Sequence, residues 1–68
     1  MNEFKIRGEF IELYKLLKAE NLCPSGGEAK LAIAEGLVKV DGQVETRKAC
    51  KIRPGQTVEY DGEVIRVP

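Results

Sequence analysis

The spacing of apolar residues changes at Gly36 from a helical period to a strand period, and this change limits the fold more than any other feature. In residues 9–19 the apolar side chains recur at intervals of three and four, which predicts an amphipathic helix that ends near Asn21. Ahead of this helix, residues 4–7 alternate between apolar and basic side chains, which indicates a short strand.

A second helix is predicted to begin at Ser25, because Ser25 and Glu28 have the spacing of a capping box. The helix should run to about Ala34. Gly36 then lies where a glycine in the left-handed conformation commonly ends a helix.

Residues 37–67 contain alternating segments separated by turn signals. Asp41-Gly42 and Asp61-Gly62 predict two-residue hairpin turns, because both turn positions require positive φ. Pro54-Gly55 indicates a type II turn. A short strand, two helices and several antiparallel strands make an α+β fold, and the length of 68 residues allows one domain over residues 1–68.

The residues needed for most catalytic and metal sites are absent from the sequence, which has no histidine and only two cysteines, Cys23 and Cys50. Zinc sites and hydrolytic triads depend on such residues, so we expect no metal, no cofactor and no enzyme. No apolar run approaches the roughly 18 residues of a membrane span, and no secretory signal is evident. We therefore expect a cytoplasmic protein that does not enter a membrane.

The charges are distributed unevenly along the chain, although the net charge is zero. Residues 30–53 contain six basic and three acidic residues, which gives this segment a charge of +3. A local excess of this kind indicates a partner that carries negative charge, such as a nucleic acid.

The chain resembles the S4 RNA-binding domain, a helix-pair-plus-hairpin unit known as the αL motif, over about residues 11–60. The residues that match its pattern are Leu13, Leu17, Ser25, Ala29, Lys30, Gly36, Val38, Val40, Asp41 and Gly42. Stand-alone bacterial members of the family are similar in length, and they share the Ser-Gly-Gly-x-Ala-Lys run and a basic cluster after the hairpin. The resemblance implies a monomer that binds structured RNA, with rRNA, tRNA or a ribosome-associated RNA as the candidates and the ribosomal particle as a further partner.

One departure from the family pattern concerns the start of the second helix, where many S4 domains carry arginine and this chain has Gly26 and Gly27. The glycines would let a phosphate approach the bare N–H groups of the helix start. The resemblance implies that the basic residues of the helix and hairpin gather on one face. The predicted RNA-binding residues are Ser25, Gly26, Gly27, Lys30, Lys39, Arg47, Lys48, Lys51 and Arg53.

The four aromatic residues, Phe4, Phe10, Tyr14 and Tyr60, occupy positions typical of a core. Tyr60 is the one candidate for stacking on a base. Recognition is therefore expected through the phosphate backbone and the shape of the RNA rather than through base edges.

Two alternatives to RNA binding stay open at this point. The zero net charge also suits a module that docks on a ribosomal protein or another RNA–protein particle, with RNA contacts secondary. A small redox or carrier factor that uses Cys23 or Cys50 is the third interpretation.

Overall fold

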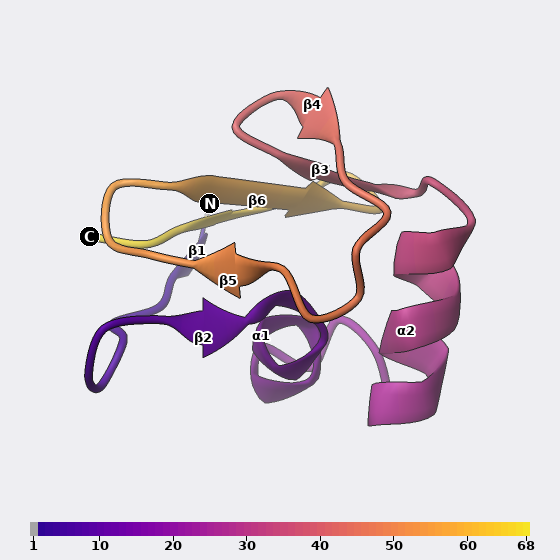
Figure 1. The fold of residues 1–68 in the computed structure, drawn as a ribbon, viewed down its shortest axis with the longest axis horizontal. Coiled ribbons are helices and arrows are strands. Elements are labelled where there is room, and N and C mark those ends of the chain that lie inside the picture. Colours follow the sequence, from indigo (N-terminus) through magenta and orange to yellow (C-terminus); the bar gives the residue numbers. More distant parts are fainter. Residues whose placement is uncertain (1) are drawn as a thin grey trace.

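A computed structural model describes residues 2–68 and shows two helices and seven short strands within that range (Figure 1). The elements in chain order are β1 (Asn2–Glu3), β2 (Ile11–Glu12), α1 (Leu13–Ala19), α2 (Gly26–Ala34), β3 (Val38–Val40), β4 (Gln43–Val44), β5 (Lys51–Ile52), β6 (Thr57–Tyr60) and β7 (Glu63–Arg66). The predicted α+β class and the αL arrangement of two helices and a hairpin are confirmed.

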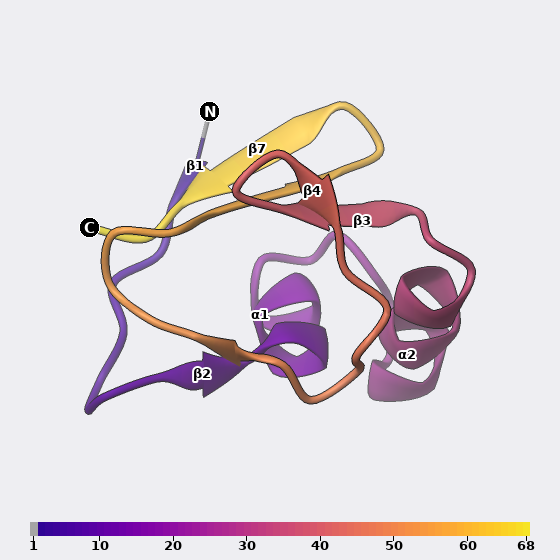
Figure 2. The ribbon, with the colours of Figure 1, turned by 45° about the horizontal axis from the view of Figure 1, so that its top comes forward.

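The elements form two layers, with a five-stranded sheet lying over the pair of helices (Figure 2). The strand order is β1-β7-β6-β3-β4; β1 runs parallel to β7, and the other neighbours are antiparallel. A separate antiparallel pair of β2 and β5 lies beside α1 and below the sheet (Figure 2). Within residues 2–68 no helix has the length and apolar character needed to cross a membrane.

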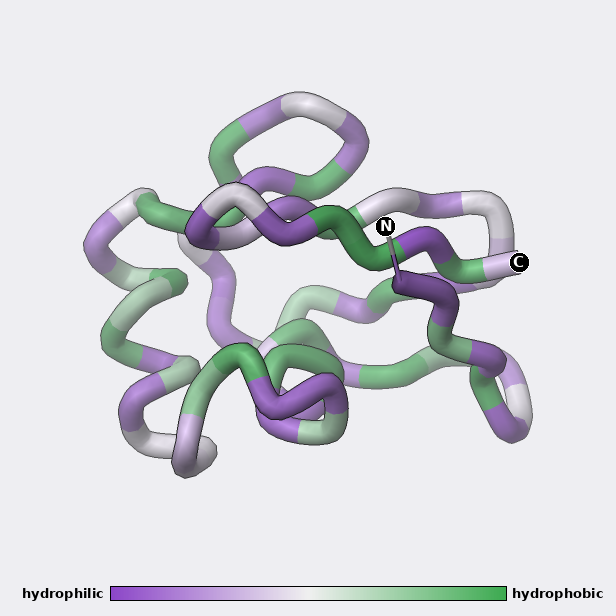
Figure 3. Tube along the Cα trace, turned by 180° about the vertical axis from the view of Figure 1, so that it is seen from behind, coloured by the Kyte–Doolittle hydropathy of each residue, from purple (hydrophilic) through white to green (hydrophobic). Residues whose placement is uncertain are grey.

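The core lies between the sheet and the helices. Hydrophobic and hydrophilic residues are interspersed along the chain (Figure 3). Both helices and strands β3, β5, β6 and β7 contribute buried apolar side chains to this layer. Each large apolar side chain that is fully buried contributes about 1.5–3 kcal/mol. The buried residues are Leu13, Leu16, Leu17, Cys23, Ala29, Ala32, Ile33, Val38, Ile52, Val58, Ile65 and Val67.

Both helices end in the same motif, in which a residue with positive φ turns the chain back over the last turn. Gly36 has φ 78° and donates its N–H to Ile33 O, and the Leu37 N–H donates to Ala32 O. Asn21 has φ 58° and occupies the equivalent position after α1. The predicted helix ends at Asn21 and Gly36 are confirmed.

The predicted turns are also confirmed by the backbone angles. Asp41 and Gly42 have φ of 51° and 83°, and Asp61 and Gly62 have φ of 51° and 79°, as a two-residue hairpin turn requires. The third turn is closed by a 3.2 Å hydrogen bond that the Gln56 N–H donates to Arg53 O across Pro54-Gly55.

The predicted start of the first helix was wrong, since α1 begins at Leu13 rather than at residue 9. Ile11 and Glu12 instead form β2, which pairs with β5. The first two N–H groups of the helix, those of Leu13 and Tyr14, donate to Cys50 O at 2.9 Å and to Lys48 O at 3.2 Å. This distant loop therefore takes the place of a side-chain cap and fixes where the helix starts.

The predicted strand over residues 4–7 was also misplaced. The strand is Asn2–Glu3, and its pairing with β7 extends only to the Phe4 N–H, which donates to Arg66 O at 2.9 Å. After Phe4 the chain leaves the sheet, and Gly8 turns it with φ 92° toward β2.

Candidate nucleic-acid interface

The start of α2 presents backbone N–H groups at the surface. Ser25 is the N-cap residue, and its Oγ accepts a hydrogen bond from the Glu28 N–H at 3.2 Å. The first N–H within the backbone ladder of the helix belongs to Ala29, which donates to Ser25 O at 3.1 Å. The N–H groups of Gly26 and Gly27 precede this ladder and therefore remain open to a ligand.

Tyr14 connects three segments that the sequence separates. A Cβ atom on Gly26 would lie 3.7 Å from the Tyr14 ring, so the ring packs against the start of α2. Lys30 Nζ lies 4.6 Å from the centre of the ring, and the Tyr14 N–H donates to Lys48 O. Two of the predicted residues, Gly26 and Lys30, therefore lie at the half-buried ring of Tyr14, and the backbone of Tyr14 holds the loop of a third, Lys48.

Lys15 joins this cluster although the sequence did not single it out. Its Nζ lies 5.8 Å from the centre of the Tyr14 ring and 2.9 Å from Glu12 Oε1. The hydrogen bond from Lys15 to Glu12 is the main reason that the pKa of Lys15 is raised. Lys15 lies in the first turn of α1. The sequence could have indicated this position only if the start of α1 at Leu13 had been predicted correctly.

Arg47 is engaged within its own loop. Its Nε and a terminal nitrogen lie 2.9 and 3.0 Å from the two carboxylate oxygens of Glu45, and its N–H donates to the same carboxylate at 2.9 Å. The side-chain hydrogen bonds from Arg47 lower the pKa of Glu45 to about 2, and the carboxylate raises the pKa of Arg47. The charge of Arg47 is thus largely compensated, unlike the charges of Lys48 and Lys51.

Phe10 is exposed at the surface, contrary to the prediction that it belongs to the core. The side chain keeps 37% of its accessible surface because it precedes β2 and lies outside the helix. Lys51 Nζ and Arg53 Cζ lie 4.9 and 5.8 Å from the centre of its ring. The antiparallel pairing of Ile11 with Ile52 brings these residues together.

Lys39 lies apart from the other basic residues. Val38 on the same strand is fully buried against the helices, so Lys39 points to the opposite face of the sheet. Its partners in the sheet are Val44 and Glu59. The expectation that all the basic groups gather on one face therefore fails for Lys39.

Neither thiol has the lowered pKa of an activated cysteine, although the guanidinium of Arg47 lies 3.8 Å from Cys50 Sγ. Cys23 is buried in the core and Cys50 is half-buried. Burial is the main cause that raises the pKa of each thiol, whereas reactive cysteines have a lowered pKa. This finding argues against the redox interpretation.

The chain is similar in sequence to a known family of domains and to individual proteins. The model of the S4 domain matches residues 4–68. The putative RNA-binding protein YbcJ of Escherichia coli (strain K12) is 60% identical over 57 residues, which are 84% of this chain and 81% of that protein. A tyrosine–tRNA ligase of Ralstonia nicotianae is 38% identical over 61 residues, which are 90% of this chain but only 16% of the ligase.

A solved structure agrees with the fold as well as with the sequence. The solution structure of YbcJ from E. coli, described as revealing an αL motif involved in RNA binding, aligns with a TM-score of 0.75 and 53% identity. The alignment covers 98% of this chain and 86% of that one.

Proposed function

The chain belongs to the S4 domain family, and from that premise we propose that it binds structured RNA mainly through the phosphate backbone. It is not an enzyme, as the sequence predicted, since the match to the tyrosine–tRNA ligase covers only a 16% share of that protein. The observation that carries the proposal is the cluster around Tyr14, where Lys30, the start of α2 and the Lys48 loop meet.

The charges in this region are available to a ligand. Within residues 2–68 the three ion pairs involve Lys15, Arg47 and Arg66, so Lys30, Lys48, Lys51 and Arg53 have no carboxylate within 4.0 Å. Phosphate groups can replace the water around these side chains and release condensed counterions, which drives association.

The start of α2 supplies a second kind of phosphate contact. The exposed N–H groups of Gly26 and Gly27 and the positive end of the helix dipole both favour an anion. Lys30 lies one turn further along the same helix, next to the Tyr14 ring. A phosphate at the helix start would therefore have both backbone and side-chain partners.

The shape of this surface suits a folded RNA. The helix start and the loop of Lys48 both contact Tyr14, so their positions relative to each other are defined. A-form RNA hides its base edges in a deep groove, and proteins that bind it contact phosphates and 2′-hydroxyl groups. Binding through these groups would be tolerant of sequence.

The experiment that tests the proposal is a salt titration of the affinity for a short hairpin RNA. Neutralisation of about four phosphates gives a log–log slope of roughly −3 to −4. The double variant Lys30→Ala with Lys51→Ala should weaken binding and reduce the slope by about 2. Lys39→Ala is the matched control, because Lys39 lies on the other face of the sheet. A salt-independent affinity would contradict the proposal.

The finer assignment is that the RNA is rRNA, tRNA or a ribosome-associated RNA, bound in the cytoplasm by a monomer. The name of the relative YbcJ supports RNA binding in general, and the ligase that contains a similar segment supports a structured RNA partner. Crosslinking in cells followed by sequencing of the bound RNA tests this assignment. Recovery of unstructured messenger RNA alone would overturn it.

One observation favours the second candidate function, docking on a protein of an RNA–protein particle. Leu31, Leu37 and Val44 are all large apolar side chains that are more than half exposed. Affinity capture with and without ribonuclease separates the two candidates, since partners that depend on RNA disappear after digestion. The variant Leu37→Ala would weaken only the ribonuclease-resistant partners.

A further inference from the structure

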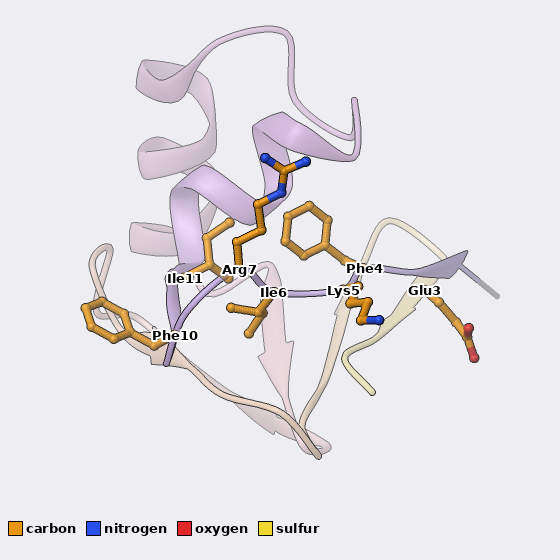
Figure 4. A pocket seen from close by; sticks show the side chains of 7 residues that line it. All are labelled: Glu3, Phe4, Lys5, Ile6, Arg7, Phe10 and Ile11. Atoms are coloured by element: carbon orange, nitrogen blue, oxygen red, sulfur yellow. The ribbon is translucent and has the colours of Figure 1, made fainter.

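A shallow groove runs along the segment between β1 and β2. It has a volume of about 450 Å³ and is lined by Glu3, Phe4, Lys5, Ile6, Arg7, Phe10 and Ile11. Figure 4 shows Phe10 at one end of this segment and Glu3 at the other, with Ile6 between them. Ligand sites in proteins commonly have volumes of about 300–1,000 Å³ and apolar walls with a few polar groups.

The groove combines apolar and aromatic surface with positive charge. Phe4, Ile6 and Ile11 are half-buried and pack on the core, so they form a fixed apolar floor. Lys5 and Arg7 are exposed and take part in none of the ion pairs within residues 2–68.

The one acidic residue of the groove is compensated. Glu3 Oε2 lies 2.9 Å from a terminal nitrogen of Arg66, outside the groove lining. The uncompensated charges around the groove are therefore those of Lys5 and Arg7. This charge favours a ligand that carries an anion beside its apolar part.

Phe10 forms an aromatic wall of the groove, and two cations contact its ring. Lys51 Nζ and Arg53 Cζ lie 4.9 and 5.8 Å from the centre of its ring, and cation–π contacts of this kind stabilise the ring in this position. A wall that is already ordered loses less conformational entropy when a partner stacks on it. The same two cations would lie near the phosphate of a nucleotide stacked on the ring.

The groove is continuous with the proposed RNA surface. A second hollow shares Phe10 and Ile11 with the groove and is also lined by Glu12, Lys15 and Lys51. Lys15 Nζ lies 5.8 Å from the centre of the Tyr14 ring, and Lys30 Nζ lies 4.6 Å from the same point. A path of basic and aromatic side chains therefore leads from the start of α2 to Phe10 and the groove.

We infer that this groove binds one unpaired nucleotide that flanks the helical part of the RNA, with its base stacked on Phe10. An apolar, aromatic recess rimmed by lysine and arginine has the chemistry that recognises a base together with its phosphate. This inference rests on the proposed RNA binding and adds a specific feature of the ligand. It also makes Phe10, rather than Tyr60, the stacking residue.

The test uses two hairpin RNAs with the same duplex, one fully paired and one with a single bulged 2-aminopurine. The chain should bind the bulged RNA at least about 5-fold more tightly, and the fluorescence of the 2-aminopurine should be quenched on binding. Phe10→Leu should remove both the preference and the quenching. Phe10→Tyr, which keeps an aromatic ring, should retain both.

The outcomes separate this inference from the proposed function. Equal affinity for the two hairpins, without quenching, overturns the inference and leaves phosphate binding intact. Failure to bind either hairpin overturns the proposed function and the inference together. Because the quenching is measured on the unaltered chain, the test does not depend on the folding of Phe10→Leu.

Discussion

Glu45 holds Arg47 through both carboxylate oxygens, with hydrogen bonds of 2.9 and 3.0 Å from the guanidinium and a third, at 2.9 Å, from the Arg47 backbone N–H. The two residues are separated by a single position, so the pair closes a compact loop directly after the hairpin. This loop precedes the segment whose backbone carbonyls receive the first N–H groups of α1. The pair therefore has consequences for both stability and charge.

The pair predicts a specific loss of stability in acid. Because the pKa of Glu45 is lowered from 4.5 to about 2, its contribution is complete above pH 4.5 and is lost as the pH falls toward 2. Thermal unfolding at several pH values in this range should show a steeper decline of Tm for the unaltered chain than for Glu45→Gln. Parallel declines for the two proteins would show that the pair adds no stability.

The same substitution should strengthen RNA binding. In Glu45→Gln the guanidinium of Arg47 loses its anionic partner and becomes available to a phosphate. We expect a higher affinity for the hairpin RNA and a salt slope that is steeper by about 1. The control is the double variant Glu45→Gln with Arg47→Gln, which removes both charges of the pair and should therefore bind the hairpin RNA about as well as the unaltered chain. A large loss in that control would contradict this view of the loop.

Substitution of a glycine at the start of α2 should lower the affinity for RNA without lowering the stability of the fold. A Cβ atom on Gly27 would lie 3.9 Å from Ser25 Oγ, an ordinary contact, so Gly27→Ala should fold at least as stably as the unaltered chain. Its methyl group would nevertheless hinder a phosphate that approaches the bare N–H groups. Binding assays on this variant and on Gly27→Val should show a stepwise loss of affinity. Unchanged affinity in a folded variant would argue against a phosphate at this position.

We expect the side chain of Asp41 to contribute more to stability than that of Asp61, although both residues occupy turns of the same type. Its carboxylate accepts hydrogen bonds from the Thr57 N–H at 2.9 Å and from Gln56 Nε2 at 3.1 Å, which tie the hairpin to β6. Asp61 has the same φ of 51° and forms no such bonds among those of residues 2–68. Asp41→Ala should therefore destabilise the chain by about 1–2 kcal/mol more than Asp61→Ala, measured by urea unfolding. Equal losses would show that only the backbone conformation matters.

Local signals in the sequence predicted local structure well. The Ser25 cap, the helix end at Gly36 and the Asp41-Gly42 turn each depend on residues that are adjacent or one helical turn apart. Their conformations follow from sterics and short-range hydrogen bonds. These elements are sufficient to place the helices and the hairpin.

Features that depend on distant segments could not be read in the same way. The start of α1 and the exposure of Phe10 both result from the pairing of β2 with β5, which no local pattern reveals. The core position assigned to Phe10 followed from a helical period that this pairing interrupts. The role of Tyr14 as the contact between α2 and the Lys48 loop likewise depends on how these segments pack.

The parallel pairing of β1 with β7 has a consequence for how the chain is synthesised. Asn2 and Glu3 are synthesised well before their partners Ile65 and Arg66. The helix pair can form on the nascent chain, whereas the core positions of Ile65 and Val67 stay empty until these residues have been synthesised. Closure of the sheet therefore follows formation of the helices, and the incomplete domain exposes apolar surface until β7 has been added.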